Sequence, residues 1–510
     1  MKKRIFFKNA VILTLTSLIL RVVGICLRIY IANSIGAEGM GLHALIFTVY
    51  TFASAVASSG LSLAVTRLVT DDFAAGGKTA VRAILRKAFL LSLLLGCGAM
   101  AVLYLFSDAI AAYALCDTRT ALSLRILAFG LPFISISACF KGYFMARRNA
   151  KTPSNSQLLE QVVRILSVVL LLRPMSGYGL GYACAAVVIG NAVSEVLACL
   201  YLWLGYKKDT AKMTYNGVVK SNILSRLCSV FIPVAFTGHM NTALHMAENL
   251  IVPQALTRYT RDSSLGLAQF GMLKGMALPT LFFPASFLTS LSSLLVPEMS
   301  EYGAKNQRKS IARTAEFTLR ITIVSSILIA GIFMAYPKEI AQFLYHDAEV
   351  GFYIAALAPI VPFMYLESIV TGILHGLGQQ MSTLKYNLAN SALRISAVLF
   401  FVPKFGMPGF LWIMIFSNLY TSISCLHRLF HVANIHIQWR HWVVAPALCC
   451  AIALLACQVY NRFGTGLLHL LGGGVLFMVV FAVFAYISGV ITHADFAQIH
   501  TALHRQKQKQ

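Results

Sequence analysis

Apolar segments long enough to cross a lipid bilayer recur along the whole chain and constrain its fold more than any other feature. About 20 apolar residues span the hydrocarbon core as a helix, which satisfies its own backbone hydrogen bonds there. Hydrophobic residues make up 58% of the 510 residues and charged residues 12%, whereas about a quarter of a soluble protein is charged. The sequence therefore predicts an all-α polytopic membrane protein with about fourteen transmembrane helices, near residues 9–35, 40–69, 83–106, 121–146, 156–173, 178–206, 223–256, 266–296, 311–336, 351–377, 382–402, 407–430, 441–460 and 465–492.

The segments between these helices carry a biased positive charge. The net charge is +24. With a cytoplasmic N-terminus, 27 of the 42 Lys and Arg residues fall on the cytoplasmic side, 7 on the opposite side and 8 within spans. Cytoplasmic loops of membrane proteins carry such an excess, so we expect both termini in the cytoplasm and an even number of spans. The positive charge then requires no nucleic acid partner.

An internal repeat at an offset of 230 residues divides the chain. The matches that occur without a gap include Leu131-Pro132-Phe133 with Val361-Pro362-Phe363, Gly142 with Gly372, Arg164-Ile165 with Arg394-Ile395, and Gly179 with Gly409. The offset spans six helices, an even number, so the two copies share one orientation. Two parallel six-helix lobes are a known transporter plan. We predict an N-lobe over 1–215, a C-lobe over 216–435, and two further helices with a basic cytoplasmic tail over 436–510.

Motifs for catalysis or metal binding are scarce. The eleven cysteines include no CxxC spacing, and most lie in apolar runs, where cysteine behaves as a small hydrophobic residue. No complete phosphate-binding loop and no hydrolase or kinase pattern is present. We therefore predict no catalytic residue, no metal site and no cofactor, and do not expect an enzyme.

Basic residues inside the predicted spans are the better indication of function, because each costs at least about 2.5 kcal/mol at the bilayer centre unless it is paired or hydrated. Arg21 and Arg28 lie two turns apart on one face of the first helix. In a cavity, two guanidiniums favour an anion such as a diphosphate. Lys274, in the eighth segment, is a third candidate for this site. Contact with lipid headgroups is the alternative for Arg28 and Lys274.

Acidic residues in the spans are candidates for charge pairing or for coupling to a cation. Glu248 could pair with Arg28, bind a coupling cation or carry a proton. Glu160 and Arg164 are spaced i, i+4 and are expected to pair on one helix face. At the repeat positions, Asn390 and Arg394 replace them, so the second arginine lacks that acid. Glu195 and Glu367 have no predicted partner.

Several motifs resemble a known family. The opening Arg21-x2-Gly24-x3-Arg28 and Ala32-x2-Ile35-Gly36-Ala37-Glu38-Gly39-x-Gly41-Leu42 is similar to that of polysaccharide transporters in the multidrug/oligosaccharidyl-lipid/polysaccharide superfamily. Within this superfamily, the resemblance is to the oligosaccharide flippase family and its stage V sporulation protein B-like branch. Further matching stretches, over roughly residues 8–430, include Lys141-Gly142-Tyr143-Phe144 and Gln157-Leu158-Leu159-Glu160-Gln161-Val162-Val163-Arg164-Ile165.

The resemblance implies fourteen helices in two lobes and export of a lipid-linked sugar precursor. Lipid II flippases resemble the chain more distantly. Their first-helix cavity arginines correspond to Arg21 and Arg28, and an acid that some of them use for sodium falls near Glu248. The chain departs from them because its second helix has no central arginine and Lys274 lies a turn or more from their arginine.

Together these features predict an alternating-access flippase for an undecaprenyl-diphosphate-linked saccharide in the cytoplasmic membrane, with the forespore membrane as a further expectation. Its partners would be the lipid-linked substrate, membrane lipids and cell-wall synthesis enzymes. Coupling to Na⁺, to H⁺ or to the membrane potential is left open. The alternatives are a cation-coupled multidrug antiporter of the same fold and a non-transporting scaffold for cell-wall synthesis.

Overall fold

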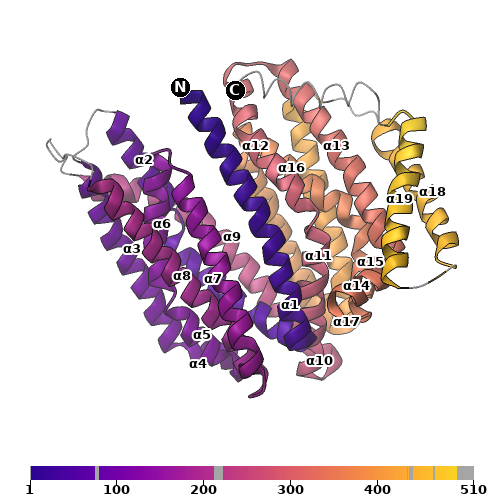
Figure 1. The fold of residues 1–510 in the computed structure, drawn as a ribbon, viewed down its shortest axis with the longest axis horizontal. Helices are drawn as coiled ribbons and strands as arrows, with labels where there is room; N and C mark the ends of the chain where they lie inside the picture. Colours follow the sequence, from indigo (N-terminus) through magenta and orange to yellow (C-terminus); the bar gives the residue numbers. More distant parts are fainter. Residues whose placement is uncertain are drawn as a thin grey trace. The chain divides into compact units, whose positions relative to one another are not determined.

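The computed structural model describes residues 2–74, 80–211, 222–433, 435, 440–462, 464 and 466–490. Within these residues the chain forms helices joined by short turns, without a β-strand (Figure 1). The elements are α1 (Lys2–Ser58), α2 (Leu61–Ala74), α3 (Ala80–Leu105), α4 (Ser107–Ala109), η1 (Ile110–Ala114), η2 (Thr118–Thr120), α5 (Ala121–Ala128), α6 (Leu131–Ala146), α7 (Lys151–Ser176), α8 (Leu180–Thr210), α9 (Ile223–Thr260), α10 (Ser263–Gly271), η3 (Met272–Ala277), α11 (Leu278–Phe282), α12 (Ala285–Ala304), α13 (Arg308–Ala335), α14 (Pro337–Tyr345), α15 (Glu349–Leu357), η4 (Ala358–Ile360), α16 (Val361–Gly376), α17 (Gln380–Ala433), η5 (Arg440–Val444), α18 (Ala445–Tyr460) and α19 (Leu467–Ile487).

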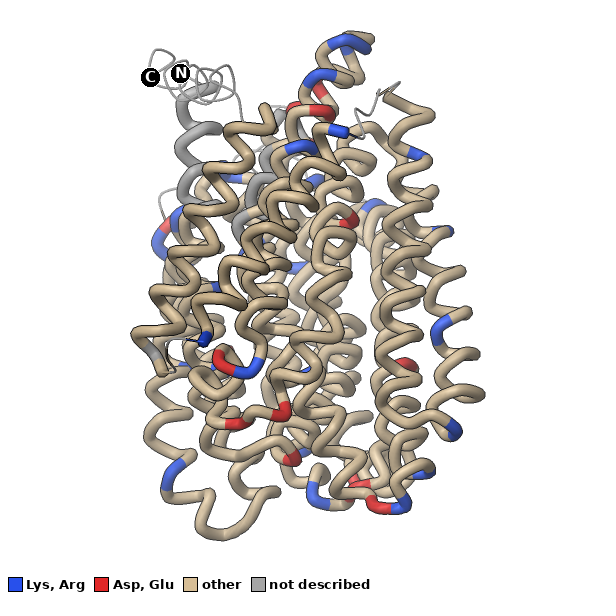
Figure 2. Tube along the Cα trace, turned by 90° about the vertical axis from the view of Figure 1, so that its right-hand side faces the viewer, with Lys and Arg blue, Asp and Glu red and all other residues tan. Residues whose placement is uncertain are grey.

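In the described residues, each of the fourteen apolar segments predicted from the sequence lies largely on helices. By length and hydropathy, nine helices of the described residues can cross a membrane, and the bent pair Thr118–Ala128 and Leu131–Ala146 would make a tenth. One of these helices, α17, contains two predicted segments, and α1 contains one predicted segment and most of a second, which continues into α2. Figure 2 shows long uncharged stretches along the helices. The chain is therefore a multi-pass membrane protein, and the number fourteen stays a prediction.

The chain divides into two compact units, residues 1–275 and 276–510. In the first unit, α9 and α10 pack against α1, although both were expected in the lobe over 216–435. In the second unit, α12, α13 and α17 pack against α16, and α18 packs against α19. The predicted lobes over 1–215 and 216–435 stay a prediction, and the basic tail at the end of 436–510 lies outside the described residues.

Glycines of the sequence motif around residue 40 let two helices approach closely. Gly36 breaks α1 with a φ of 69°, a left-handed conformation that glycine adopts without strain. Beyond this kink, a Cβ on Gly41 would lie 2.2 Å from the carbonyl oxygen of Leu267 in α10. A Cβ on Gly271 would lie 2.0 Å from the carbonyl oxygen of Ala37. The motif therefore serves close packing of α10 on α1.

The start of α10 is fixed by a side-chain cap. Asp262 Oδ1 accepts hydrogen bonds from the backbone nitrogens of Ser264 and Leu265 and from the Ser264 hydroxyl. The bonds from Ser264, followed by that from Leu265, hold the pKa of the exposed Asp262 carboxyl below its usual range. This cap sets the first residue of α10, the helix that carries Phe270 and leads into Lys274.

The repeat has a structural counterpart around its prolines. Pro132 and Pro362 each stand in the first turn of a 16-residue helix, α6 and α16, where a missing backbone N–H costs nothing. The glycine equivalence differs from the expectation. Gly179 has a φ of 112°, and the break in α17 is at Gly406 with a φ of 60°, three residues before Gly409. The break between helices occurs at the glycine with a positive φ. The ungapped alignment did not identify that glycine in the second copy.

Adding a methyl group at Gly271 is expected to destabilise the first unit. Gly271→Ala would force Cβ against the Ala37 carbonyl, and overpacking of this kind costs about 1–3 kcal/mol. Thermal unfolding in detergent measures the effect. The matched control is Gly98→Ala in α3, because no atom lies within 4 Å of its added Cβ. Equal melting temperatures for the two variants would contradict close packing at Gly271.

Candidate functional site

The first unit contains a cavity of about 460 Å³. Both halves of α1 line it, from Gly24 to Ile31 before the kink and from Met40 to Thr51 after it. The remaining wall comes from α7, α8, α9, α10 and η3. The kink at Gly36 thus folds one continuous helical segment around two sides of the same space.

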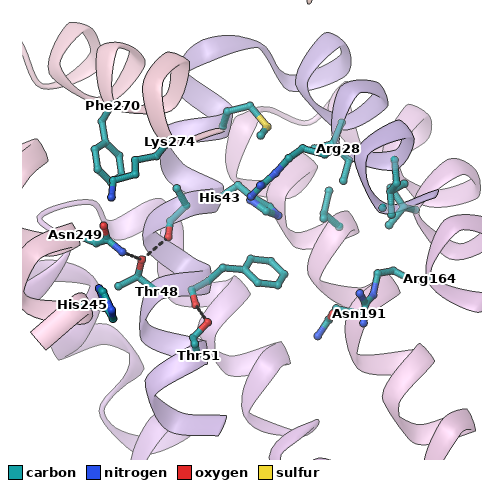
Figure 3. A pocket seen from close by; sticks show the side chains of 18 of the residues that line it. Arg28, His43, Thr48, Thr51, Arg164, Asn191, His245, Asn249, Phe270 and Lys274 are labelled. Atoms are coloured by element: carbon teal, nitrogen blue, oxygen red, sulfur yellow. Dashed lines mark hydrogen bonds between the residues drawn. The ribbon is translucent and has the colours of Figure 1, made fainter. Parts of the chain in front are cut away.

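Three basic side chains from three elements line this cavity: Arg28 of α1, Arg164 of α7 and Lys274 of η3. Figure 3 shows Arg28 beside His43, with Lys274 near Phe270 and Arg164 near Asn191. The sequence predicted Arg28 and Lys274 for one site, and the structure brings them to one cavity together with Arg164.

Lys274 is paired with Glu248, a buried acid on α9. Its Nζ lies 3.6 Å from Glu248 Oε1, and the exposed side-chain fractions are 21% and 4%. Of the three roles left open for Glu248, pairing is the one that the geometry supports, with Lys274 as a partner, and pairing with Arg28 stays a prediction. Lys274 reaches Glu248 because α10 packs on α1 and brings η3 beside α9.

Arg164 is paired with Glu160 on the same helix, at 2.6 Å between Arg164 Nη2 and Glu160 Oε1. This is the i, i+4 contact expected from the spacing. Within the described residues, Arg164 Nε is buried without a hydrogen-bond partner. Because a guanidinium has five N–H donors, Arg164 can keep Glu160 and still donate to a ligand in the cavity.

Arg21 does not line this cavity, whose α1 wall begins at Gly24. Its side chain is exposed, and seven residues of helix place it about 10 Å along α1 from Arg28. A role for Arg21 in substrate binding stays a prediction.

Asn390 and Arg394 lie in the second unit and are joined through Ser417. Arg394 Nη2 and Nε donate to Ser417 Oγ at 2.6 and 2.9 Å, and Ser417 Oγ donates to Asn390 Oδ1 at 2.7 Å. Arg394 also lines an apolar groove of about 600 Å³ with aromatic walls. Where Arg164 contacts an acid in the first unit, Arg394 contacts a hydroxyl that is itself bonded to an amide.

Polar residues that the sequence reasoning missed complete the cavity wall. Asn249 Nδ2 donates to Thr48 Oγ1 at 3.3 Å, and His43 stacks on Phe47 with ring centroids 4.4 Å apart. Within the part of the chain that the structure describes, His43 Nδ1 and Asn249 Oδ1 are buried without hydrogen-bond partners. The i, i+4 spacing of His245 and Asn249 in an apolar helix was the available signal.

An apolar groove of about 260 Å³ lies between α1 and α7. It is lined by Val22, Val23, Cys26, Leu27, Tyr30, Ile165 and Val169. Leu27 lines both the groove and the polar cavity, and Arg28 follows it in the helix. A cationic pocket and an apolar surface therefore adjoin each other within the first unit.

Comparisons with known proteins agree with the resemblance noted in the sequence. Residues 6–227 match the model of the polysaccharide biosynthesis protein family. The predicted resemblance is confirmed. The chain is 24% identical to stage V sporulation protein B of Bacillus subtilis (strain 168), over 96% of this chain and 97% of that protein. It is 22% identical to lipid II flippase MurJ of the same strain, over 64% of each chain.

A solved structure supports the fold. Lipid II flippase MurJ in an inward closed conformation superimposes with a TM-score of 0.72 at 15% identity, covering 93% of this chain and 97% of that one. At this identity the likeness shows the fold alone. Together with the match to the polysaccharide biosynthesis family, this likeness confirms the predicted all-α polytopic fold.

The Lys274–Glu248 pair predicts an order of stabilities among variants. Lys274→Met would leave the more deeply buried Glu248 without this partner, which costs about 1–3 kcal/mol. Glu248→Gln would cost less, because Lys274 is nearer the cavity, and the double variant would recover part of the loss. A double-mutant cycle by thermal unfolding in detergent measures these differences. Additive losses in the double variant would show that the two side chains do not interact.

Proposed function

We propose that this protein is a flippase that moves an undecaprenyl-diphosphate-linked saccharide across the cytoplasmic membrane by alternating access. The observation that carries this proposal is the cationic cavity beside an apolar groove in the first unit. A lipid diphosphate has the same two parts, an anionic headgroup and an apolar chain. Arg28 would bind the diphosphate, helped by Arg164 and Lys274.

The charges in the cavity suit an anion. Glu160 and Glu248 are each paired with a basic residue, and Arg28 adds a further cation beside them. Guanidinium groups bind phosphate oxygens through two parallel hydrogen bonds. His43, Asn249 and Arg164 Nε supply further polar atoms, which would orient the headgroup.

The apolar groove suits the isoprenoid chain. Its side chains come from α1 and α7, and Val22 and Tyr30 are partly exposed at its surface. Lipid tails are as apolar as the groove, so the chain can exchange contacts with lipid for contacts with the groove without entering water. The shared Leu27 would place the first isoprene unit next to Arg28.

The relatives support the class of cargo. One is named stage V sporulation protein B and another lipid II flippase MurJ, and the second name is that of a lipid flippase, the class of transporter proposed here. A peptidoglycan precursor or a polysaccharide repeat unit fits the cavity chemistry equally. Location in the forespore membrane, both termini in the cytoplasm, and cell-wall synthesis enzymes as partners belong to the same proposal.

The two alternatives make different demands on the cavity. A cation-coupled multidrug antiporter would need acidic groups available to a cationic drug, whereas Glu160 and Glu248 are paired with Arg164 and Lys274. A scaffold for cell-wall synthesis would tolerate neutral residues at Arg28, because partners would bind loops. Replacing Arg28 therefore separates the proposed function from the scaffold, and a cationic dye separates it from the antiporter.

Leaflet exchange of a fluorescent undecaprenyl-diphosphate-linked saccharide in liposomes tests the proposal. Arg28→Ala is expected to lower the exchange rate about tenfold or more, since a hydrogen bond to a charged group contributes about 1.5–3 kcal/mol. Arg28→Lys should keep part of the rate because it keeps the charge. Arg173→Ala, at an exposed arginine near the end of α7, should exchange the lipid as the wild type does.

Two results would overturn this proposal. One is exchange by Arg28→Ala at the wild-type rate. The other is a wild-type protein that exchanges no lipid-linked saccharide under any ion gradient or membrane potential. Export of a cationic dye by the same liposomes would favour the multidrug antiporter.

A further inference from the structure

Behind the cavity wall lies a buried carboxyl group that the proposed binding site does not use. Glu195 of α8 is 8% exposed. Its Oε1 accepts hydrogen bonds from the Tyr50 hydroxyl of α1 and from Asn191 Nδ2, the latter at 2.7 Å. Asn191 is 4% exposed and lines the cavity. A single amide therefore connects this carboxyl with the proposed diphosphate site.

The two oxygens of Glu195 have different surroundings. Oε1 receives both donors, while Oε2 is buried and has no hydrogen-bond partner among the described residues. Oε2 lies against Gly130, where an added Cβ would be 2.5 Å from it. The other groups nearest to this added Cβ are the Leu127 carbonyl oxygen and the Tyr50 hydroxyl. The carbonyl oxygen can only accept a hydrogen bond, and the hydroxyl already donates to Oε1.

An ionised carboxylate spreads its charge over both oxygens and needs donors at each. Leaving one charged oxygen buried without a donor is costly, whereas a neutral carboxylic acid avoids most of that cost. In the acid, Oε2 carries the proton, and Oε1, as the carbonyl oxygen, accepts from Tyr50 and Asn191. The arrangement around Glu195 matches the acid.

Few charged groups face Glu195. On α7 they are Arg164 and Glu160, which are paired with each other, and on α1 the titratable neighbour is Tyr50. Of the other elements that pack on α8, η2 carries Arg119, which pairs with Glu38 and Asp117, α5 carries Arg125, which pairs with Asp108, and α6 carries Lys141.

We propose that Glu195 is a proton-binding site whose protonation and the binding of an anion in the cavity favour each other. Asn191 and Arg164 belong both to the surroundings of Glu195 and to the cavity wall. A diphosphate there repels a second negative charge at Glu195, so anion binding stabilises the protonated carboxyl. By linkage, protonation strengthens anion binding by the same factor.

The linkage between protonation and anion binding rests on the proposed function, whereas the proton site itself does not. A proton site at Glu195 follows from the buried carboxyl whatever the cargo is. With a lipid diphosphate as cargo, the proton becomes the coupling ion, because the two ligands bind together. Transport would then respond to a pH gradient as well as to membrane potential.

Infrared spectroscopy of the purified protein in nanodiscs tests the proton site directly. The wild type should show a protonated-carboxyl C=O stretch that disappears as pH is raised and that the difference from Glu195→Gln assigns to Glu195. Glu195→Gln should lack that band at every pH. Tyr50→Phe should keep the band but move it to higher frequency, because the C=O at Oε1 loses one donor. The control Glu339→Gln, at an exposed acid in α14, should leave the band unchanged.

Linkage is tested in the same sample with geranylgeranyl diphosphate as the probe, its binding followed by calorimetry. At a pH where half of the band has disappeared, the bound probe should restore it in the wild type. Under the same conditions Arg28→Ala, which binds the probe weakly, should show little change.

Each failure has a separate meaning. Identical spectra for the wild type and Glu195→Gln at all pH values would overturn the proton site, and Tyr50→Phe provides the second test if the Gln variant does not fold. Bound probe with an unchanged band would overturn the linkage. Absence of probe binding with a Glu195 band still present would contradict the proposed function and leave the proton site standing. If the pH midpoint of the band moves when NaCl replaces choline chloride, Na⁺ binds at this carboxyl, and the proposed proton site would instead be a Na⁺ site.

Discussion

An ionised side chain inside a membrane-spanning helix loses its water, and the cost of that loss organises the charged residues of this protein. Glu160 pairs with Arg164 and Glu248 with Lys274, while Arg394 binds the Ser417 hydroxyl. Each arrangement replaces water by a charge or a polar group. The cavity of the first unit is the place where several such groups meet, so it is also the place where an added anion would recover the largest attraction.

The backbone that makes this meeting possible depends on small residues. Gly36 breaks α1 at a kink, and Gly41 and Gly271 let α10 approach to backbone contact. This approach carries Lys274 to the cavity that Arg28 lines. Function therefore depends on packing at positions without side chains, and the glycines of the motif contribute to the site without touching a ligand.

Hydropathy predicted the helices because long apolar segments have one stable form in a bilayer, and all fourteen segments are largely helical in the described residues. Local spacing predicted the Glu160–Arg164 pair, because i, i+4 residues are neighbours on any helix. The sequence could not show that Glu248 pairs with Lys274, or that Arg21 lies outside the cavity wall, because both depend on how helices rotate and pack. His43 and Asn249 were missed for the same reason, and the break at Gly406 was missed because Gly406 and Gly409 lie three residues apart and only one of them takes the positive φ.

The central claim is that one unit of the protein binds both parts of a lipid diphosphate, its headgroup in the cavity and its chain in the groove between α1 and α7. A cryo-electron microscopy structure with undecaprenyl diphosphate in nanodiscs tests this most directly. We expect density for the two phosphates beside Arg28 and continuous density for the chain past Leu27 into the groove. Lipid density elsewhere, with the cavity unchanged from the lipid-free protein, would contradict it.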